Sequence, residues 1–96
     1  MNADANPAQP VTRDEILTLV QTLLAEILEK SPDEIVEDAE FEALGADSLA
    51  LIELVEALEE SLSARSAGFH IDDEDLEALS SVRLSVDYVT NRLQDA

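Results

Sequence analysis

The chain has 96 residues, enough for one domain with a single hydrophobic core. Hydrophobic residues make up 46% of it and aromatic residues only 3%, so the core must be mainly aliphatic. Cysteine is absent from the sequence, which excludes disulfides, a thiolate nucleophile and cysteine-ligated metal sites. The formal net charge of -18 disfavours nucleic acid and anionic membranes as partners and favours proteins with basic surfaces.

The N-terminal residues 1–11 contain Pro7 and Pro10 and few apolar side chains, which predicts a flexible leader before a single domain at 12–94. The leader lacks the apolar segment of a signal peptide, and no apolar run in the sequence is long enough to span a membrane. We therefore expect a cytoplasmic protein.

The first predicted helix covers residues 13–29. Thr12 and Glu15 have the spacing of a capping box, in which a hydroxyl and a carboxylate each accept a backbone hydrogen bond. Apolar residues then recur at helical spacing: Ile16, Val20, Leu23, Leu24, Ile27 and Leu28.

Residues 31–47 are predicted to form one helical turn followed by an ordered loop. Ser31 and Glu34 repeat the capping pattern, with proline at the first helical position, but no periodic run follows. Three apolar side chains can pin this loop by burial: Ile35, Phe41 and Leu44.

The second long helix is predicted at 48–61, with different residues on its two faces. Its core stripe consists of Leu51, Leu54, Val55, Leu58 and Leu62. Its opposite face carries Leu49, Glu53, Glu56 and Glu60. Residues 31–64 hold eleven acidic side chains and no lysine or arginine, so an apolar Leu49 beside this row suggests a docking surface.

A connection at 63–70 leads to two further predicted helices. The first is short, at 72–79, and turns Leu76 and Leu79 inward. Ser81 can cap the last helix, whose apolar residues are Val82, Val86, Val89 and Leu93. The fold class is therefore all-α: a small four-helix bundle with three longer helices and one short helix.

The segment with the clearest chemical signal is Leu-Gly-Ala-Asp-Ser-Leu at 44–49, where a loop ends and a helix begins. Ser48 places a hydroxyl at the start of the helix, where free amides and the positive end of the dipole favour a phosphate. Gly45 would keep the approach to this hydroxyl uncrowded, and Asp47 could help to hold a divalent cation during attachment. The alternative is that Asp47 or Ser48 simply caps the helix.

This segment resembles the attachment motif of acyl carrier proteins, and the resemblance extends over about residues 12–94. It includes Phe41, the run Glu-Leu-Val-Glu-Ala-Leu-Glu-Glu at 53–60, Ile-Asp-Asp-Glu-Asp at 71–75 and Asp-Tyr-Val at 87–89. The resemblance implies a non-catalytic carrier domain with a 4'-phosphopantetheine arm on Ser48. The thiol of the arm would hold acyl or polyketide intermediates as thioesters.

The resemblance also implies the partners of a monomeric carrier. They are a phosphopantetheinyl transferase, a ketosynthase, an acyltransferase and other acyl-processing enzymes with basic docking patches. The residues expected to meet them through weak, reversible ion pairs and an apolar contact are Asp47, Leu49, Glu53, Glu56, Glu59 and Glu60. The residues expected to line a space for the acyl chain are Leu54, Leu58, Leu76 and Tyr88, with plain core packing as the alternative.

Three features depart from the pattern of fatty-acid carriers. The stretch at 61–70 is longer, Ala50 and Leu51 replace a polar pair, and Glu56 stands where those carriers often have methionine. These departures favour a free-standing polyketide-type carrier. Two other hypotheses stay open: a peptidyl or aminoacyl carrier with the same arm, and an acidic helical interaction protein without a prosthetic group.

Catalytic and metal-binding residues are not expected. The acidic run at 72–75 lacks the ligand spacing and turn glycine of a calcium loop, so a solvated helix start is the better interpretation. His70 is the only histidine in the sequence, which excludes a multi-histidine metal site. Ser48 lacks the second glycine of a nucleophile elbow, which argues against a serine hydrolase.

Overall fold

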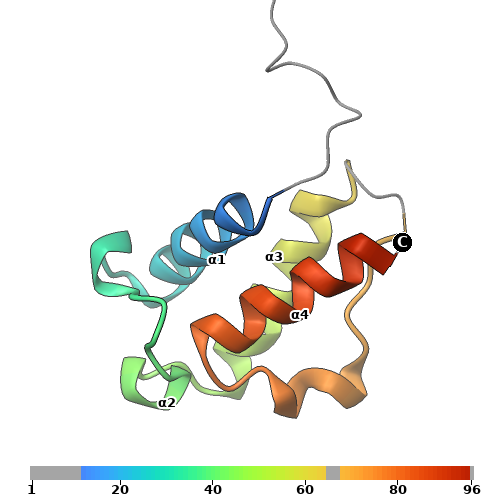
Figure 1. The fold of residues 1–96 in the computed structure, drawn as a ribbon. Coiled ribbons are helices and arrows are strands. Elements are labelled where there is room, and N and C mark those ends of the chain that lie inside the picture. The colour runs from blue at the N-terminus through green and yellow to red at the C-terminus, as the bar shows by residue number, and fades with distance from the viewer. Residues whose placement is uncertain (1–11, 65–67, 96) are drawn as a thin grey trace, which may run out of the picture.

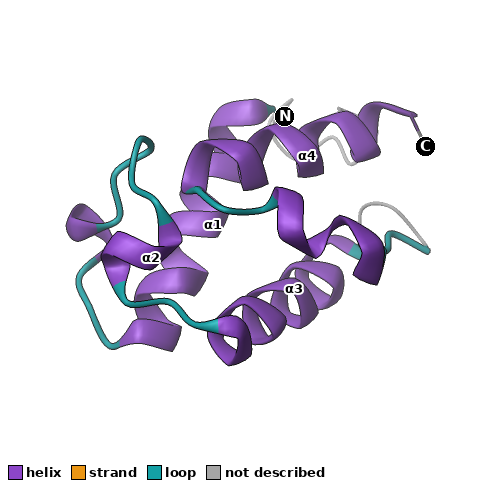
Figure 2. Ribbon diagram, turned by 90° about the horizontal axis from the view of Figure 1, so that it is seen from below, coloured by secondary structure: helices purple, strands orange, loops and turns teal. Residues whose placement is uncertain are grey.

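The computed structural model describes residues 12–64 and 68–95, and within these ranges it consists of helices joined by loops (Figure 1; Figure 2). The predicted leader lies outside the described residues. The elements are α1 (Arg13–Leu28), η2 (Pro32–Glu34), α2 (Phe41–Leu44), α3 (Ser48–Leu62), η3 (Asp73–Ala78) and α4 (Val82–Asp95), where η denotes a 3-10 helix. The all-α fold with three longer helices is confirmed. No helix in the described ranges has the length and apolarity needed to cross a membrane.

Helix α1 begins at the capping box that the sequence predicts. The Glu15 amide donates to Thr12 Oγ1 at 3.2 Å, and the Thr12 amide donates to Glu15 Oε1 at 3.0 Å. The helix ends at Leu28, its C-cap Glu29 has a left-handed φ of 58°, and the Lys30 amide donates to the Ala25 carbonyl at 2.8 Å. Both ends are thus closed by hydrogen bonds that replace missing intrahelical partners.

The core is built around α1, which packs directly against both α3 and α4, whereas α3 and α4 approach each other less closely. The buried aliphatic and aromatic side chains come from all three long helices and from the connections between them. The largest contributions are Ile16, Val20, Leu24, Ile35, Phe41, Leu54, Leu58, Leu62, Ile71, Leu79, Val82, Val86 and Val89. Within α3, Ala50 is buried while Leu51 is only half-buried, so the core stripe is slightly rotated from the predicted one.

Helix α2 corrects the expectation of a continuous loop before α3. Glu40 is extended and forms an isolated antiparallel bridge with Ser81, and the Phe41 amide donates to the Ser80 carbonyl at 3.0 Å. The helix ends one turn later at Leu44, and its C-cap Gly45 has a φ of 82°. Four residues are too few to show an apolar period, so the sequence carries no helical signal here. The start of α2 depends on contacts with the distant start of α4.

The short helix expected at 72–79 is a 3-10 helix, η3, rather than an α-helix. The Asp75 amide donates to the Asp72 carbonyl at 2.9 Å, and the Leu79 amide donates to the Leu76 carbonyl at 3.0 Å. Leu79 is buried and Leu76 half-buried, so both turn inward as predicted. The tighter helix is typical of short connecting pieces held by their neighbours rather than by their own hydrogen bonds.

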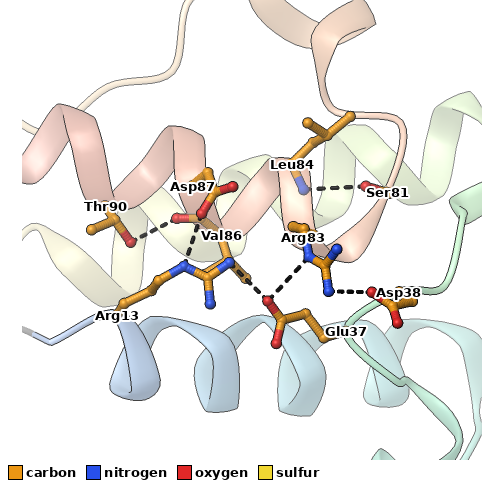
Figure 3. Close-up of polar contacts among 9 residues, drawn as sticks. All are labelled: Arg13, Glu37, Asp38, Ser81, Arg83, Leu84, Val86, Asp87 and Thr90. Carbon is orange, nitrogen blue, oxygen red and sulfur yellow. Dashed lines mark hydrogen bonds and ion pairs between the residues drawn. The ribbon is translucent and has the colours of Figure 1, made fainter.

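A cluster of charged side chains joins α1, the loop before α2, and α4 (Figure 3). Arg13 Nη2 lies 2.8 Å from Glu37 Oε2, and Arg13 Nε donates to Asp87 Oδ1 at 2.8 Å. Arg83 contacts the same Glu37 oxygen at 3.4 Å and also pairs with Asp38. We call these five residues the arginine clasp. The clasp holds the loop that leads to α2 against both helices.

Candidate functional site

Ser48 is the first residue of α3, and its side chain is exposed. Asp47 precedes it as the N-cap and accepts a hydrogen bond from the Ala50 amide at 2.9 Å. A Cβ placed on Gly45 would meet no described atom within 4 Å, so Gly45 is needed for its positive φ and not for space. The turn from α2 into α3 instead sets where the Ser48 hydroxyl lies.

The start of α3 is chemically suited to a phosphate linked through Ser48. The first amides of a helix lack intrahelical acceptors, and the positive end of the helix dipole lies among them. Asp47 satisfies the Ala50 amide, which leaves the Ser48 and Leu49 amides without an intrahelical acceptor. A phosphodiester on the serine would sit beside these donors, so the residues present fit a phosphate-linked group.

A groove of about 360 Å³ opens beside Ser48, where the start of α3 meets α2 and η3. Its lining residues are Phe41, Glu42, Ala46, Asp47, Ser48, Leu51, Ile52, Leu76, Glu77, Leu79 and Ser80. Phe41 and Leu79 also belong to the buried core, so the groove leads from an exposed hydroxyl to an aliphatic interior. An extended apolar chain attached to Ser48 can lie in such a groove.

Of the four residues predicted to line a space for an acyl chain, Leu76 is in this groove. Leu54 and Leu58 lie deeper in the core, each 1% exposed, and Tyr88 is half-buried on α4 outside the groove lining. The sequence analysis did not assign Phe41 or Leu79 to the lining. Both had been recognised as inward-facing, but their meeting beside Ser48 depends on tertiary contacts.

Polar contacts hold η3, one wall of the groove, against α4. Tyr88 Oη donates to Asp75 Oδ2 at 2.5 Å, and burial followed by this hydrogen bond raises the pKa of Tyr88 above its usual value. Arg92 lies over the Tyr88 ring at 5.7 Å from its centroid, and Arg92 Nη1 is 3.5 Å from Asp72 Oδ2. These side-chain contacts fix η3 against α4, and η3 in turn forms the side of the groove that faces the start of α3.

The outer face of α3 carries most of the residues predicted to meet partners. Leu49 is 63% exposed, and Glu53, Glu56 and Glu60 are exposed along the same helix. Ile52, 44% exposed, adds a second apolar side chain that the sequence analysis missed. Its position three residues after Leu49 was the signal that could have identified it. The face therefore combines an apolar pair near Ser48 with a row of carboxylates.

Glu59 differs from the other predicted partner residues because it is engaged within the chain. Its Oε2 accepts a hydrogen bond from the Ile71 amide at 2.8 Å and lies 2.9 Å from His70 Nδ1. Glu59 is half-buried and anchors the segment that leads into η3. A role for it in partner docking stays a prediction.

No cluster of three or more metal-ligating side chains was found in the described ranges, which include the acidic run at 72–75. The carboxylates of that run are used differently. Asp75 accepts the Tyr88 hydroxyl, and Asp72 pairs with Arg92.

Comparisons with known proteins bear on the same region. The family model for the phosphopantetheine attachment site matches residues 18–89. The acyl carrier protein of Cyanidium caldarium is 37% identical over 86 residues, which cover 88% of this chain and 94% of that protein. The acyl carrier protein of Thermosynechococcus vestitus is 37% identical over 84 residues, covering 86% and 98%. That of Rubrobacter xylanophilus is 41% identical over 78 residues, covering 80% and 90%.

Proposed function

This chain belongs to the acyl carrier proteins, which bear phosphopantetheine and are not enzymes themselves, and we propose that Ser48 is the residue that carries the arm. The observation that supports Ser48 is an exposed hydroxyl at the first residue of α3, beside a groove that reaches the core. The arm supplies a thiol on which acyl groups are held as thioesters. The chain itself contains no cysteine that could do this.

Loading of the arm tests this proposal. The protein is incubated with coenzyme A, Mg²⁺ and a broad-specificity phosphopantetheinyl transferase, and its intact mass is measured. We expect one added phosphopantetheine on the wild type and none on Ser48→Ala. Ser61→Ala, which removes another exposed hydroxyl of α3, is the matched control and should load like the wild type. A folded wild type that gains no mass, or a Ser48→Ala variant that still does, would overturn the assignment.

The cargo that we propose is an acyl or polyketide intermediate. Support comes from the apolar floor of the groove, formed by Phe41 and Leu79, and from the three sequence departures that favour a polyketide-type carrier. Competitive loading with malonyl and aminoacyl groups by the matching transferases checks the class of cargo. Preferential aminoacyl loading would replace the proposal with a peptidyl carrier.

Docking through the outer face of α3 is the second part of the proposal. Its partners would be the phosphopantetheinyl transferase, a ketosynthase, an acyltransferase and related enzymes with basic patches. The exposed Leu49 and Ile52 offer apolar contact near the arm, while the carboxylates of Glu53, Glu56 and Glu60 attract a basic surface. Exposed ion pairs are individually weak, which suits a carrier that must leave each enzyme after one step. A monomeric state and a cytoplasmic location stay predictions.

A further inference from the structure

Ser85 on α4 carries a buried hydroxyl that the fold leaves unsatisfied. Its side chain is 0% exposed, and Ser85 Oγ has no hydrogen-bond partner among the described residues. Thr90, on the same helix, shows the usual solution, because its hydroxyl donates to the Val86 carbonyl at 2.7 Å. An unpaired hydroxyl in an aliphatic core destabilises a fold. Ser85 is therefore a polar group in position to bind something that the chain itself does not provide.

The helical position of Ser85 shows which way it faces. Residues three and four positions apart share a helix face, and for Ser85 these include the buried Val82 and Val89 and also Tyr88, which bonds to η3. Asp87, which binds α1, is two residues away and thus about 200° around the helix. Ser85 therefore lies on the face of α4 that carries Val82, Val89 and Tyr88, on the opposite side of the helix from Asp87. On this face Val82 and Val89 belong to the core, and Tyr88 bonds to η3.

The groove beside Ser48 and the face of α4 that carries Ser85 share apolar neighbours in the core. Leu76 and Leu79 line the groove, and Leu79 is also part of the core that includes Val82. The wall is held to α4 by the hydroxyl of Tyr88, one helical turn from Ser85. A chain that starts at Ser48 and passes Leu76 and Leu79 therefore enters the core that includes Val82 and Val89, the neighbours of Ser85 on α4.

We propose that Ser85 is a specificity-determining residue for the cargo, whose hydroxyl hydrogen-bonds a keto or hydroxyl oxygen on the acyl chain tethered at Ser48. This inference rests on the proposed function. A saturated chain leaves the hydroxyl unpaired, whereas a keto oxygen accepts a hydrogen bond from it. One such hydrogen bond would shift the equilibrium between an acyl chain in solvent and the same chain inside the bundle about fivefold towards the inside.

The test uses wild-type protein loaded at Ser48 with hexanoyl, 3-oxohexanoyl or 5-oxohexanoyl phosphopantetheine from the corresponding coenzyme A thioesters. The fraction of time that the acyl chain spends inside the bundle is measured by the rate at which hydroxylamine cleaves the thioester, because a buried chain is cleaved more slowly. Rates are compared between variants that carry the same cargo. In Ser85→Ala, we expect at least one oxo thioester to be cleaved about fivefold faster, with no acceleration for hexanoyl. Ser61→Ala, which removes an exposed hydroxyl of α3 outside the groove lining, is the control and should match the wild type.

A second readout separates this role from ordinary core packing. Without a loaded arm, Ser85→Ala should leave the melting temperature unchanged or raise it, because the hydroxyl has no partner to lose. Equal cleavage rates for both oxo cargoes in wild type and Ser85→Ala, or a lower melting temperature of the unloaded variant, would overturn the inference alone. Absence of loading at Ser48, seen by intact mass, would overturn the proposed function and the inference with it.

Discussion

Single charged residues decide how the loop before α2 is held. Glu37 accepts contacts from Arg13 on α1 and Arg83 on α4, and its carbonyl accepts a hydrogen bond from the Arg83 amide at 3.0 Å. Exposed ion pairs contribute little one by one. Here, however, two of them share one carboxylate, so the loss of the Glu37 charge removes the ion pair with α1 and one ion pair with α4. The backbone hydrogen bonds to α4 and the Arg83–Asp38 pair remain.

Glu37→Gln should lower the melting temperature near neutral pH, and the difference from wild type should vanish in acid. The hydrogen bond from Arg13, and then that from Arg83, lowers the pKa of Glu37 below its usual value of 4.5. A lowered folded-state pKa contributes stability above the unfolded-state pKa, and this contribution is lost as the pH falls through the folded-state pKa. Thermal melts at a series of pH values measure the difference.

The matched control for this variant is Asp33→Asn, because Asp33 is exposed on η2 and has no ion pair with the described residues. It should change the melting temperature little at any pH. A Glu37→Gln effect of equal size at neutral and acid pH would mean that the carboxylate charge does not matter to the clasp.

Among the elements, α3 packs into the core with one face and presents the proposed docking surface with the other. Leu54, Val55 and Leu58 bury one face in the core, while the other face stays exposed and acidic. Surface substitutions on the exposed face should leave the core untouched, so the two purposes can be separated by mutation.

Reversing Glu53 and Glu56 to lysine should slow acyl transfer from a partner enzyme without unfolding the domain. Two exposed pairs, each contributing up to about 1 kcal/mol, predict a loss of transfer efficiency of up to roughly thirtyfold at low salt. Transfer is measured as a function of salt, since high ionic strength should reduce the difference. Asp14→Lys with Asp33→Lys adds the same charge outside α3 and serves as the control. Equal losses for both double variants would remove α3 from the docking proposal.

For the whole molecule, the high net negative charge is a feature that works against folding. The chain has 23 acidic and 5 basic residues, and the described ion pairs can use only a few of those carboxylates. The remainder repel one another in a compact domain. The short spacing of the carboxylates along α3 and its neighbours makes this repulsion sensitive to ions in solution.

The melting temperature should therefore rise from dilute buffer to moderate salt, and it should rise further with Mg²⁺ at equal ionic strength. Salt also weakens the ion pairs of the arginine clasp, but these involve only five side chains. The repulsion that salt relieves comes from a net charge of -18, so the melting temperature should rise. Differential scanning calorimetry across a salt series provides the measurement. A flat or falling melting temperature would show that the carboxylates are too far apart to repel significantly.

Local signals were enough to predict the long helices and the position of Ser48. Capping residues and apolar spacing act within a few positions of the chain, so α1 was expected at 13–29 and runs over Arg13–Leu28, and α3 was expected at 48–61 and runs over Ser48–Leu62. The exposure of Leu49 follows from the same helical period. These features needed no knowledge of what lies across the fold.

The tertiary structure decided everything that depends on residues far apart in the chain. The start of α2 requires Ser80 and Ser81, and the use of Glu59 requires the amide of Ile71. The groove exists because residues 41–52 meet residues 76–80, which lie far away in the chain, and the unpaired hydroxyl of Ser85 is visible only once its surroundings are known. The physical reason is that capping and periodicity are local interactions, whereas burial and hydrogen-bond satisfaction are properties of the packed chain.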